Sequence, residues 1–547
     1  MLLKKETRQL LWRIGASAGF GLTATIVHAD TITLISQDQS MEISGDFKGF
    51  SEGSYIIDVA DLGILRVRAD LVECIGESCP FQKQDPNVEI IFDEIAPEVV
   101  ESEAEEGTDN PITFAGSELL SNRLVPSLLA KFSQSKGMST ADVGDLDGRQ
   151  NINMTEIGDE NAVRASFQVA STSSRGAFEA LSDPATNFGL STRPIEADEA
   201  RDLRDTNAGN LNNSRQQHIL GTDNLAISIN PANDVNTISL PDIARIYSGE
   251  ITNWQDIGGR DAPIVIYSRD SNSGAQYSFL QQVMEPAGRE VTPSVNVLDT
   301  NEAMAESILS DVNGIGYVSA ATVENVKPVS LEMSCGISYF PTDFAAKTNE
   351  FPLRNQLYLY NRDDNLNETA TDFIDFVGSS EIDNLVTDAG FVNLSVSASP
   401  QDIQTSRVRF LLEDATRPEE FVAARNLLID MLDWERLSTT FRFSSGSARL
   451  DAQGRNELAR LVQFMKEQPQ GVEIAVVGFT DTDGAFGPNL GLSTSRAARV
   501  AEQISNDFSD LDITVKGYGE LSPVACNDSV NGKRLNRRVE VWIRHQS

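Results

Sequence analysis

The first part of the chain alternates apolar and polar residues with a period of two. Within residues 64–69, Leu65 and Val67 alternate with Arg66 and Arg68, and residues 31–34 and 55–59 repeat the pattern between glycine-containing turns. A period of two is typical of strands with one face in solvent. We therefore predict a small all-β module over residues 30–95.

From residue 111 to about residue 396 the pattern changes to alternating strands and helices. The apolar residues 112–115 end at Gly116 and Ser117, and Leu120, Leu124, Leu128 and Phe132 then follow at helical spacing. Residues 263–267 and the turn 268–274 repeat this arrangement. A strand that leads into a Ser/Gly turn at a helix N-terminus directs backbone N–H groups at one spot, so we predict an anion site in an α/β domain.

The last 150 residues contain a helical segment and a mixed domain. Phe421, Ala424, Leu427, Leu428 and Met431 recur at helical spacing, which indicates core packing in a connector over residues 397–437. Residues 438–547 then read as strand, helix, strand, helix and strand, with apolar strands at 472–478 and 539–543. This order predicts a small α+β domain of the β-α-β-α-β type.

The ends of these regions carry targeting and linker signals. Residues 1–29 place four basic side chains before an uncharged run and end in Val27-His28-Ala29, which predicts an export signal cleaved after Ala29; the run is short for a membrane span. Residues 93–109 hold eight acids and no Lys or Arg, which predicts a solvated linker over 96–110 instead of a spaced calcium loop.

Composition excludes several classes of function. The formal net charge of −37, from 81 acidic and 44 basic residues, makes nucleic acid an improbable partner. Only three histidines occur, so the chain has very few residues that could act as zinc ligands or as the base of a Ser-His-Asp triad. We expect no catalytic activity, no metal and no cofactor.

Four cysteines suit an oxidising compartment. Cys74 and Cys79 lie close enough in sequence to close one loop, and we predict a disulfide between them. Cys335 and Cys526 either bridge two domains or remain buried thiols, and sequence does not decide between these.

Four segments of residues 111–396 resemble the phosphate-type periplasmic solute-binding proteins, in the order of that family. They are 189–194 (GLSTRP), 218–225 (HILGTDNL), 246–254 (IYSGEITNW) and 269–274 (RDSNSG). The resemblance implies two α/β lobes with a hinge and a ligand cleft between them.

The positions that match the family's phosphate site hold Ser117, Arg269, Ser273 and Gly274, and we add Thr192 and Arg193 as candidate anion contacts. Ala275 and Thr192 depart from the usual Thr and Asp of the family, and Glu118 introduces a carboxylate. Each lost hydrogen bond to a charged ligand costs about 1.5–3 kcal/mol. The sequence is therefore compatible with two interpretations: a phosphate receptor, or a solute-binding fold whose cleft is degenerate and which contacts another protein.

An acid and a base flank the loop after the apolar strand 472–478. Asp481 follows that strand, and we predict that Ser493 caps a helix with Arg496 in its first turn. Asp481 would accept an ammonium group and Arg496 would grip a carboxylate, which suits an amino acid head group. The alternative is a simple surface ion pair between the two side chains.

A second resemblance favours the ligand site. Residues 480–484 (TDTDG), Asn489, 492–500 (LSTSRAARV), 517–523 and 532–540 resemble the OmpA-like peptidoglycan-binding domain over about 110 residues. It implies that Asp481 and Arg496 hold the amino and carboxylate groups of diaminopimelate, with Thr480, Ser493 and Asn489 beside them. Asn489, Asn527 and Arg537 are expected to brace the loops more than to touch ligand.

These observations predict a protein of the periplasm of a Gram-negative-type envelope, bound non-covalently to peptidoglycan and possessing a binding domain for phosphate or a related oxyanion. Association with the outer membrane is a further possibility, and an ABC transporter or another envelope protein is a candidate partner. The alternative is a structural envelope protein whose solute-binding fold contacts another protein.

Overall fold

The computed structural model describes the strands within residues 31–75 and most of residues 110–545. The described ranges are 31–36, 42–51, 54–59, 63–68, 72–75 and 110–545 except 323–324, 402–406, 410, 412–416, 444–451, 469–470 and 509–510. The predicted signal (1–29), nearly all of the acidic linker and Cys79 lie outside these ranges. The Cys74–Cys79 disulfide therefore stays a prediction.

Contacts divide the chain into two units, Met1–Glu101 and Ser102–Ser547. In the first unit five strands pair into one antiparallel sheet of order β4-β3-β2-β1-β5. The strands are β1 (Thr31–Ser36), β2 (Glu42–Ser51), β3 (Ser54–Val59), β4 (Gly63–Arg68) and β5 (Val72–Ile75). Ile57 in β3 is fully buried, as one face of a sheet requires.

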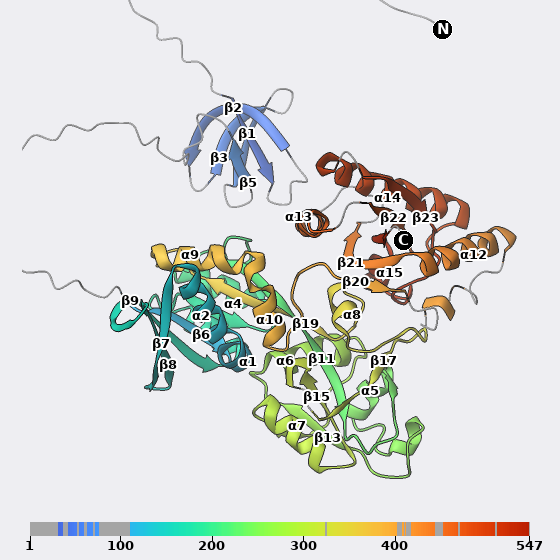
Figure 1. Cartoon of the computed structure of the whole chain (residues 1–547), viewed down its shortest axis with the longest axis horizontal. Helices are drawn as coiled ribbons and strands as arrows, with labels where there is room; N and C mark the ends of the chain where they lie inside the picture. The colour runs from blue at the N-terminus through green and yellow to red at the C-terminus, as the bar shows by residue number, and fades with distance from the viewer. Residues whose placement is uncertain are drawn as a thin grey trace, which may run out of the picture. The chain divides into compact units, whose positions relative to one another are not determined.

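The second unit begins with an α/β domain in two lobes (Figure 1). Its largest sheet follows the order β14-β13-β15-β11-β19-β10-β6-β9-β8-β7. The strands are β6 (Ile112–Ser117), β7 (Met138–Leu146), β8 (Arg149–Glu156), β9 (Asp159–Thr172), β10 (Phe188–Ser191), β11 (Gln217–Ile229), β13 (Val265–Arg269), β14 (Asn296–Leu298), β15 (Gly314–Ser319), β16 (Lys327–Pro328) and β19 (Arg354–Asn361), with β12 (Thr237–Ser239), β17 (Ser330–Glu332) and β18 (Ser338–Tyr339) in a small separate sheet.

Helices cover this sheet in both lobes. They are α1 (Glu118–Arg123), α2 (Val125–Ser135), α3 (Ser174–Ala180), α4 (Ala197–Asp205), α5 (Leu240–Tyr247), α6 (Gly274–Phe279), α7 (Asn301–Ser310), α8 (Asp343–Lys347), α9 (Glu368–Val377) and α10 (Asp383–Asp388). The helical face predicted from Leu120 to Phe132 is buried as expected, but it belongs to two helices that meet at Leu124.

Each lobe has its own apolar core. The lobe 1 core, drawn from residues 112–220 and 357–391, includes Phe114, Phe132 and Phe373. The lobe 2 core, drawn from residues 225–353, includes Tyr247, Trp254 and Phe279. Strand β11 runs through both lobes, because Leu220 packs into the lobe 1 core and Leu225 into the lobe 2 core. The antiparallel strand β19 pairs with it between residues 354 and 360 (Figure 1). The chain therefore crosses between the lobes along this strand pair.

The C-terminal domain is a five-stranded sheet of order β20-β21-β24-β22-β23 with helices on it. Its elements are β20 (Ala398–Pro400), α12 (Pro418–Asp433), β21 (Glu435–Arg442), α13 (Ala452–Lys466), β22 (Val472–Gly478), α14 (Phe486–Asp507), β23 (Ile513–Gly517), α15 (Val530–Asn536) and β24 (Arg538–His545). The predicted elements occur in the predicted order, but the structure adds β23 and α15 between the second helix and the last strand, which the sequence pattern missed. Phe421 on α12, predicted as core, is instead 55% exposed.

Among the described residues, no helix has both the length and the apolar character that crossing a membrane requires.

Candidate functional sites

A cavity of about 270 Å³ lies where the ends of the strands of both lobes meet. Five of the six residues predicted for anion binding line it: Ser117, Thr192, Arg269, Ser273 and Gly274. Ser117 ends β6 and precedes α1, whereas Ser273 precedes α6 and accepts a hydrogen bond from the Ala275 N–H at 3.2 Å. The two strand–turn–helix segments that the sequence pattern singled out therefore converge on one cavity.

Close packing at Gly274 explains why this position has no side chain. A Cβ atom there would lie 2.2 Å from Thr192 Oγ1 and 2.6 Å from Ser174 Oγ. These two hydroxyls are themselves hydrogen-bonded at 3.2 Å, and Ser174 Oγ also accepts from the Thr192 N–H at 3.0 Å. The glycine thus allows hydroxyl groups of lobe 1 to approach the backbone of lobe 2.

Arg269 supplies the cationic group of the cavity. It is 6% exposed, and its Nη2 donates to the backbone carbonyl of Asp299 at 2.6 Å. Its Nε is buried without a hydrogen-bond partner in the described part of the chain. A buried donor without a partner costs free energy, which an oxyanion in the cavity would recover.

Carboxylates also line the cavity. Burial and the nearby Glu302 raise the pKa of Glu118, and the Arg269 charge lowers it by less. Asp223 is fully buried and accepts from Ser319 Oγ at 2.7 Å, and burial raises its pKa to about 7. Asp223 therefore carries a proton part of the time near neutral pH, and no local pattern around residue 223 predicts this.

The structure places Arg193 away from this cavity. Its Nη1 and Nη2 donate to the two carboxylate oxygens of Glu199 at 2.8 and 2.6 Å, and its guanidinium lies over the rings of Phe178 and Tyr277. Glu199 thus accepts from both terminal nitrogens of the guanidinium group in a bidentate ion pair. We correct the prediction accordingly, because Arg193 stabilises the start of α4 and does not face the cavity.

The second candidate site lies between the end of β22 and α14. The prediction that Ser493 caps this helix is wrong, since α14 begins at Phe486 and Ser493 lies two turns inside it. Pro488 is tolerated near the start because the first N–H groups of a helix have no intrahelical partner. Arg496 consequently lies in the third turn, and no free helix terminus is beside it.

Buried charges gather at this position. Asp481 is 7% exposed and accepts from Arg537 Nη1 at 2.5 Å. Arg496 is almost fully buried, with its guanidinium 5.5 Å from the centre of the Phe443 ring. Burial lowers the pKa of Arg496, the charge of Arg537 lowers it further, and Asp481 opposes both. The site is thus one carboxylate between two guanidinium groups, and Arg537 belongs to it in addition to bracing the loop.

The helix–strand packing under this site is tight. A Cβ atom at Gly478 would lie 2.0 Å from the Ser493 carbonyl oxygen, and one at Gly517 would lie 2.6 Å from Ser493 Oγ. Ser493 Oγ accepts from the Gly519 N–H at 3.0 Å. Ser493 therefore fixes α14 against the ends of β22 and β23.

Amide and charged groups hold the surrounding loops. Asn489 Nδ2 donates to Glu520 Oε2 at 2.9 Å, and Lys533 forms an ion pair with Asp483. Asn527 Oδ1 accepts from Asn536 Nδ2 at 3.0 Å, which agrees with the bracing role predicted for it. The Thr480 hydroxyl is buried beside Asp481, with no hydrogen-bond partner within the described ranges.

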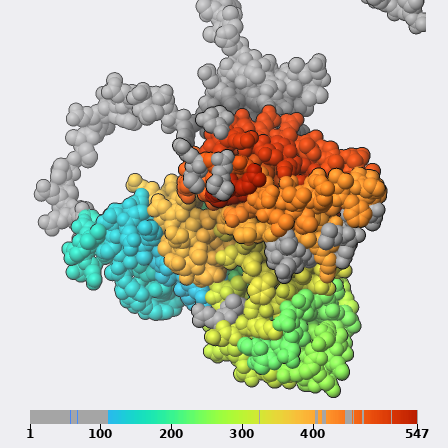
Figure 2. Space-filling view, turned by 45° about the vertical axis from the view of Figure 1, so that its right-hand side comes forward, coloured from blue at the N-terminus to red at the C-terminus, as the bar shows by residue number. Residues whose placement is uncertain are grey.

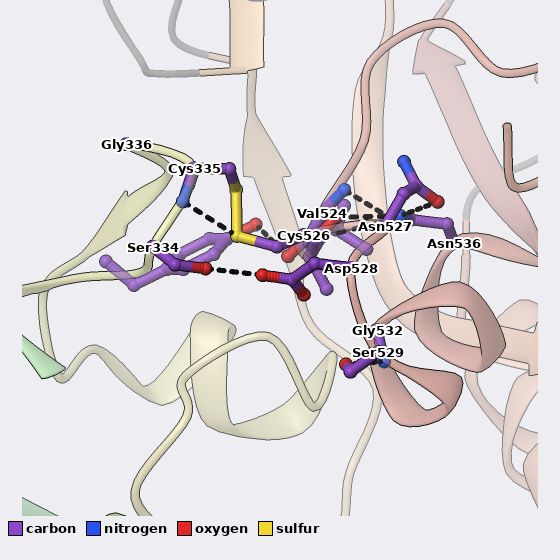
Figure 3. Close-up of a disulfide and its surroundings, with 12 residues drawn as sticks. Ser334, Cys335, Gly336, Val524, Cys526, Asn527, Asp528, Ser529, Gly532 and Asn536 are labelled. Carbon is purple, nitrogen blue, oxygen red and sulfur yellow. Dashed lines mark hydrogen bonds between the residues drawn. A yellow bond between two sulfur atoms is a disulfide. The ribbon is translucent and has the colours of Figure 1, made fainter. Parts of the chain in front are cut away.

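A disulfide joins the two domains of the second unit. Cys335 of lobe 2 pairs with Cys526 of the C-terminal domain, with Cα atoms 5.7 Å apart (Figure 3). Beside it Ser334 Oγ donates to Asp528 at 2.6 Å, and Tyr339 Oη donates to the Val524 carbonyl at 3.2 Å. Of the two possibilities that the sequence left open, the structure shows the interdomain bridge.

Buried charges lie behind the disulfide. Arg436 of β21 pairs with Glu350 of lobe 2 at 2.5 Å and with Glu540 of β24 at 3.2 Å. Glu540 also accepts from Arg407 and Arg538 at 2.9 and 2.8 Å. Burial alone would raise the pKa values of both carboxyl groups, but the Arg436 and Arg407 charges lower that of Glu350, and the Arg407, Arg436 and Arg538 charges lower that of Glu540. Lobe 2 therefore supplies one of the carboxylates that neutralise the C-terminal domain.

Comparison with known families covers both sites. Residues 154–381 match the PBP superfamily domain, and residues 442–537 match the OmpA family. The chain therefore carries a PBP superfamily domain and an OmpA family domain. The first match contains Thr192, Arg269 and Ser273 but begins within β8, after Ser117. The second contains Asp481, Arg496 and Arg537.

Individual relatives match the same two regions. The chain is 25% identical over 177 residues to the phosphate-binding protein PstS of Bacillus subtilis, which is 32% of this chain and 56% of that protein. It is 26% identical to PstS of Staphylococcus saprophyticus over 47% of this chain and 80% of that one. The probable lipoprotein YiaD of Escherichia coli is 37% identical over 102 residues, 18% of this chain and 46% of that entire protein. The chain thus spans about half of the first relative and less than half of the last.

Proposed function

We propose that this protein is held on peptidoglycan in the periplasm by its OmpA family domain and binds a protonated oxyanion, phosphate or a close analogue, in its PBP superfamily domain. An ABC transporter or another envelope protein would receive or sense the bound anion. No catalytic step is assigned to either domain.

The observation that carries the oxyanion proposal is the buried Arg269, whose Nε has no hydrogen-bond partner among the residues that the structure describes, in a cavity that also holds hydroxyl groups. Guanidinium donors and the hydroxyls of Ser117, Ser273 and Thr192 suit the oxygens of a tetrahedral anion. Glu118 and Asp223 suit its protons, because a carboxylate accepts a hydrogen bond from a P–OH group. These acceptors favour phosphate over sulfate, which carries no proton near neutral pH.

The peptidoglycan proposal rests on Asp481 between Arg496 and Arg537. The ammonium group of a diaminopimelate side chain would displace part of the Asp481–Arg537 pair, and its carboxylate would bind the guanidinium groups. The net positive charge of the three side chains favours a ligand whose carboxylates outnumber its ammonium groups. We keep Thr480, Ser493 and Asn489 as residues that shape this site.

Two binding experiments on residues 30–547 test the proposal. Calorimetry should show heat with phosphate, weaker heat with sulfate, and at least tenfold weaker phosphate binding in Arg269→Gln. Pull-down by diaminopimelate-containing peptidoglycan should be lost in Arg496→Ala and in Asp481→Ala while circular dichroism stays unchanged. Peptidoglycan binding that survives both substitutions defeats the site assignment.

The second candidate function is a structural envelope protein whose cleft is degenerate. The observation that favours it is the excess of carboxylates in the cavity, where Glu118, Asp223 and Asp270 face one arginine. Like charges repel an anion, so a fully ionised cavity would bind it poorly. If phosphate at millimolar concentration produces no heat and no thermal shift, the oxyanion proposal is refuted and this second function is favoured.

A further inference from the structure

A second, larger cavity lies between lobe 2 and the C-terminal domain. Its volume is about 1010 Å³, and its walls include Tyr277, Arg354 and Tyr358 from the α/β domain and Asn531 and Arg534 from α15. Figure 2 shows the orange and red C-terminal domain against the yellow segment that contributes to this boundary. Thr192 and Asn355 line both this cavity and the oxyanion cavity, so the two are neighbours.

The walls of the cavity bring arginines together from both domains. Arg354 begins β19 and donates from Nε to Asn349 Oδ1, whereas Arg534 is exposed on α15 and donates to Asn531 Oδ1 at 3.0 Å. Among the described residues, no carboxylate lies within ion-pair distance of either guanidinium. Arg245 and Arg289, elsewhere in the lining, are by contrast paired with acids.

A third guanidinium adds to this positive charge. Arg442 donates to the backbone carbonyls of Leu535 and Thr348, and the charges of Arg354 and Arg534 are close enough to lower its pKa. Burial is the main cause, and the pKa of Arg442 falls to about 9. Burial likewise lowers the pKa of Arg354 to about 10, with Tyr358 and Glu457 opposing the shift and Arg534 adding to it. Arg354 and Arg442 therefore both remain charged at neutral pH.

The acidic residues of the lining do not cancel this charge. Glu350 is paired with Arg436, whereas Asp528 accepts from the neutral Ser334 hydroxyl next to the disulfide and keeps its charge. On the side of Arg354 and Arg534 the lining therefore has two guanidinium groups without an ion-pair partner among the described residues, against the one Asp528 carboxylate, in a chain whose formal net charge is −37.

The domain junction fixes the position of Arg534. The disulfide at Cys526 and the Ser529 hydroxyl, which accepts from the Gly532 N–H at 3.0 Å, hold the start of α15 (Figure 3). A Cβ atom at Gly532 would lie 1.8 Å from the Cys526 carbonyl oxygen, so this turn packs directly on the helix. The two arginines consequently face one cavity without a reorganisation of either domain.

We propose that this interdomain cavity is a second anion site, in which Arg354 and Arg534 bind an oligophosphate group. Its volume suits such a ligand, since small-molecule sites commonly measure about 300–1,000 Å³. Guanidinium groups bind phosphate oxygens in a planar fork, and two of them set apart match an anion with several phosphoryl groups. Asn355, Gln356 and Asn531 supply amide donors around them.

Calorimetry of residues 30–547 with inorganic tripolyphosphate at low ionic strength, without divalent cations, tests the proposal. Arg534→Gln and Arg354→Gln should each weaken binding about tenfold or more. Arg499→Gln is the matched control, since Arg499 is exposed on α14 and does not line the cavity. Arg269→Gln should leave tripolyphosphate binding within twofold, which separates this site from the inner cavity whether or not orthophosphate binds there.

Three results would overturn the proposal: absence of tripolyphosphate binding, binding unchanged in Arg534→Gln, or binding lost in Arg269→Gln. Arg534 is exposed and bonded only within its own helix in the described structure, so its substitution should not disturb folding. The Arg534→Gln variant therefore decides the test even where Arg354→Gln lowers the melting temperature.

Discussion

The substitution Glu350→Gln tests the buried charge cluster that joins lobe 2 to the C-terminal domain. It keeps the shape of the side chain and removes one of two carboxylates that face Arg407, Arg436 and Arg538. Glu350 and Arg436 side chains are 5% and 3% exposed, so water does not compensate the lost charge. Removal of one partner from a buried pair costs about 3–5 kcal/mol, and we expect about 3 kcal/mol because Glu540 still pairs with Arg436.

The pH dependence of this effect has a definite sign. The Arg436 and Arg407 charges lower the pKa of Glu350 below its ordinary value of 4.5. A lowered carboxyl pKa stabilises the folded state above the unfolded-state pKa, and this contribution is lost as the pH falls through the folded-state pKa. The difference between wild type and Glu350→Gln should therefore be full at pH 7 and shrink below pH 4.5.

Urea unfolding of residues 30–547 followed by tryptophan fluorescence measures the difference. Trp542 Nε1 donates to Glu540 Oε2 at 2.8 Å, so its emission reports on the cluster directly. Glu502→Gln, on the exposed face of α14, is the control and should change stability by less than 0.5 kcal/mol, roughly the limit for surface positions. A loss below about 1 kcal/mol in Glu350→Gln at pH 7 would refute the account of the cluster.

Three further substitutions have distinct outcomes. Burial raises the pKa of Asp223 to about 7, so the free energy of unfolding of the wild type should fall by about 3 kcal/mol from pH 5 to pH 8. In urea titrations Asp223→Asn should flatten this pH dependence. A pH dependence that is unchanged in the variant contradicts the assignment. Cys335→Ser combined with Cys526→Ser should cost about 2–4 kcal/mol, and a Cys74–Cys335 peptide in non-reducing mass mapping of the wild type would contradict the pairing. Arg193→Gln should leave the phosphate affinity measured by calorimetry within twofold of the wild-type value. A loss of affinity equal to that of Arg269→Gln would show that Arg193 belongs to the anion site.

Local patterns in the sequence predicted much of the fold because they report local structure. Alternation with period two located the strands of the first unit, and helical spacing located the buried face from Leu120 to Phe132. The Ser/Gly turns at 117 and 273–274 were also correct, since a strand that ends at a helix N-terminus leaves its signature in adjacent residues.

The errors in the candidate sites have physical causes. Ser493 precedes Arg496 in a pattern typical of a helix start, but Gly487 and Pro488, which read as a loop, lie in the first turn of α14. Arg193 stands beside a cavity residue, yet the carboxylate six residues later captures its guanidinium. Neighbouring positions in sequence do not determine which way a side chain points.

The interdomain contacts had no local signal at all. Glu350 and Arg436 are 86 residues apart, and Arg407 and Glu540 are 133 apart. Each is an ordinary charged residue in its own segment, and only the tertiary fold shows that the four are buried together. The same holds for Asp223, whose raised pKa follows from burial between the lobes.

Co-sedimentation of residues 30–547 with diaminopimelate-containing peptidoglycan in the presence of radiolabelled phosphate tests the central claim most directly. The wild type should bring both protein and label into the pellet. Arg269→Gln should sediment without label, and Arg496→Ala should leave protein and label in the supernatant. Label that sediments equally with Arg269→Gln, or protein that sediments equally with Arg496→Ala, would contradict a wall-anchored oxyanion-binding protein.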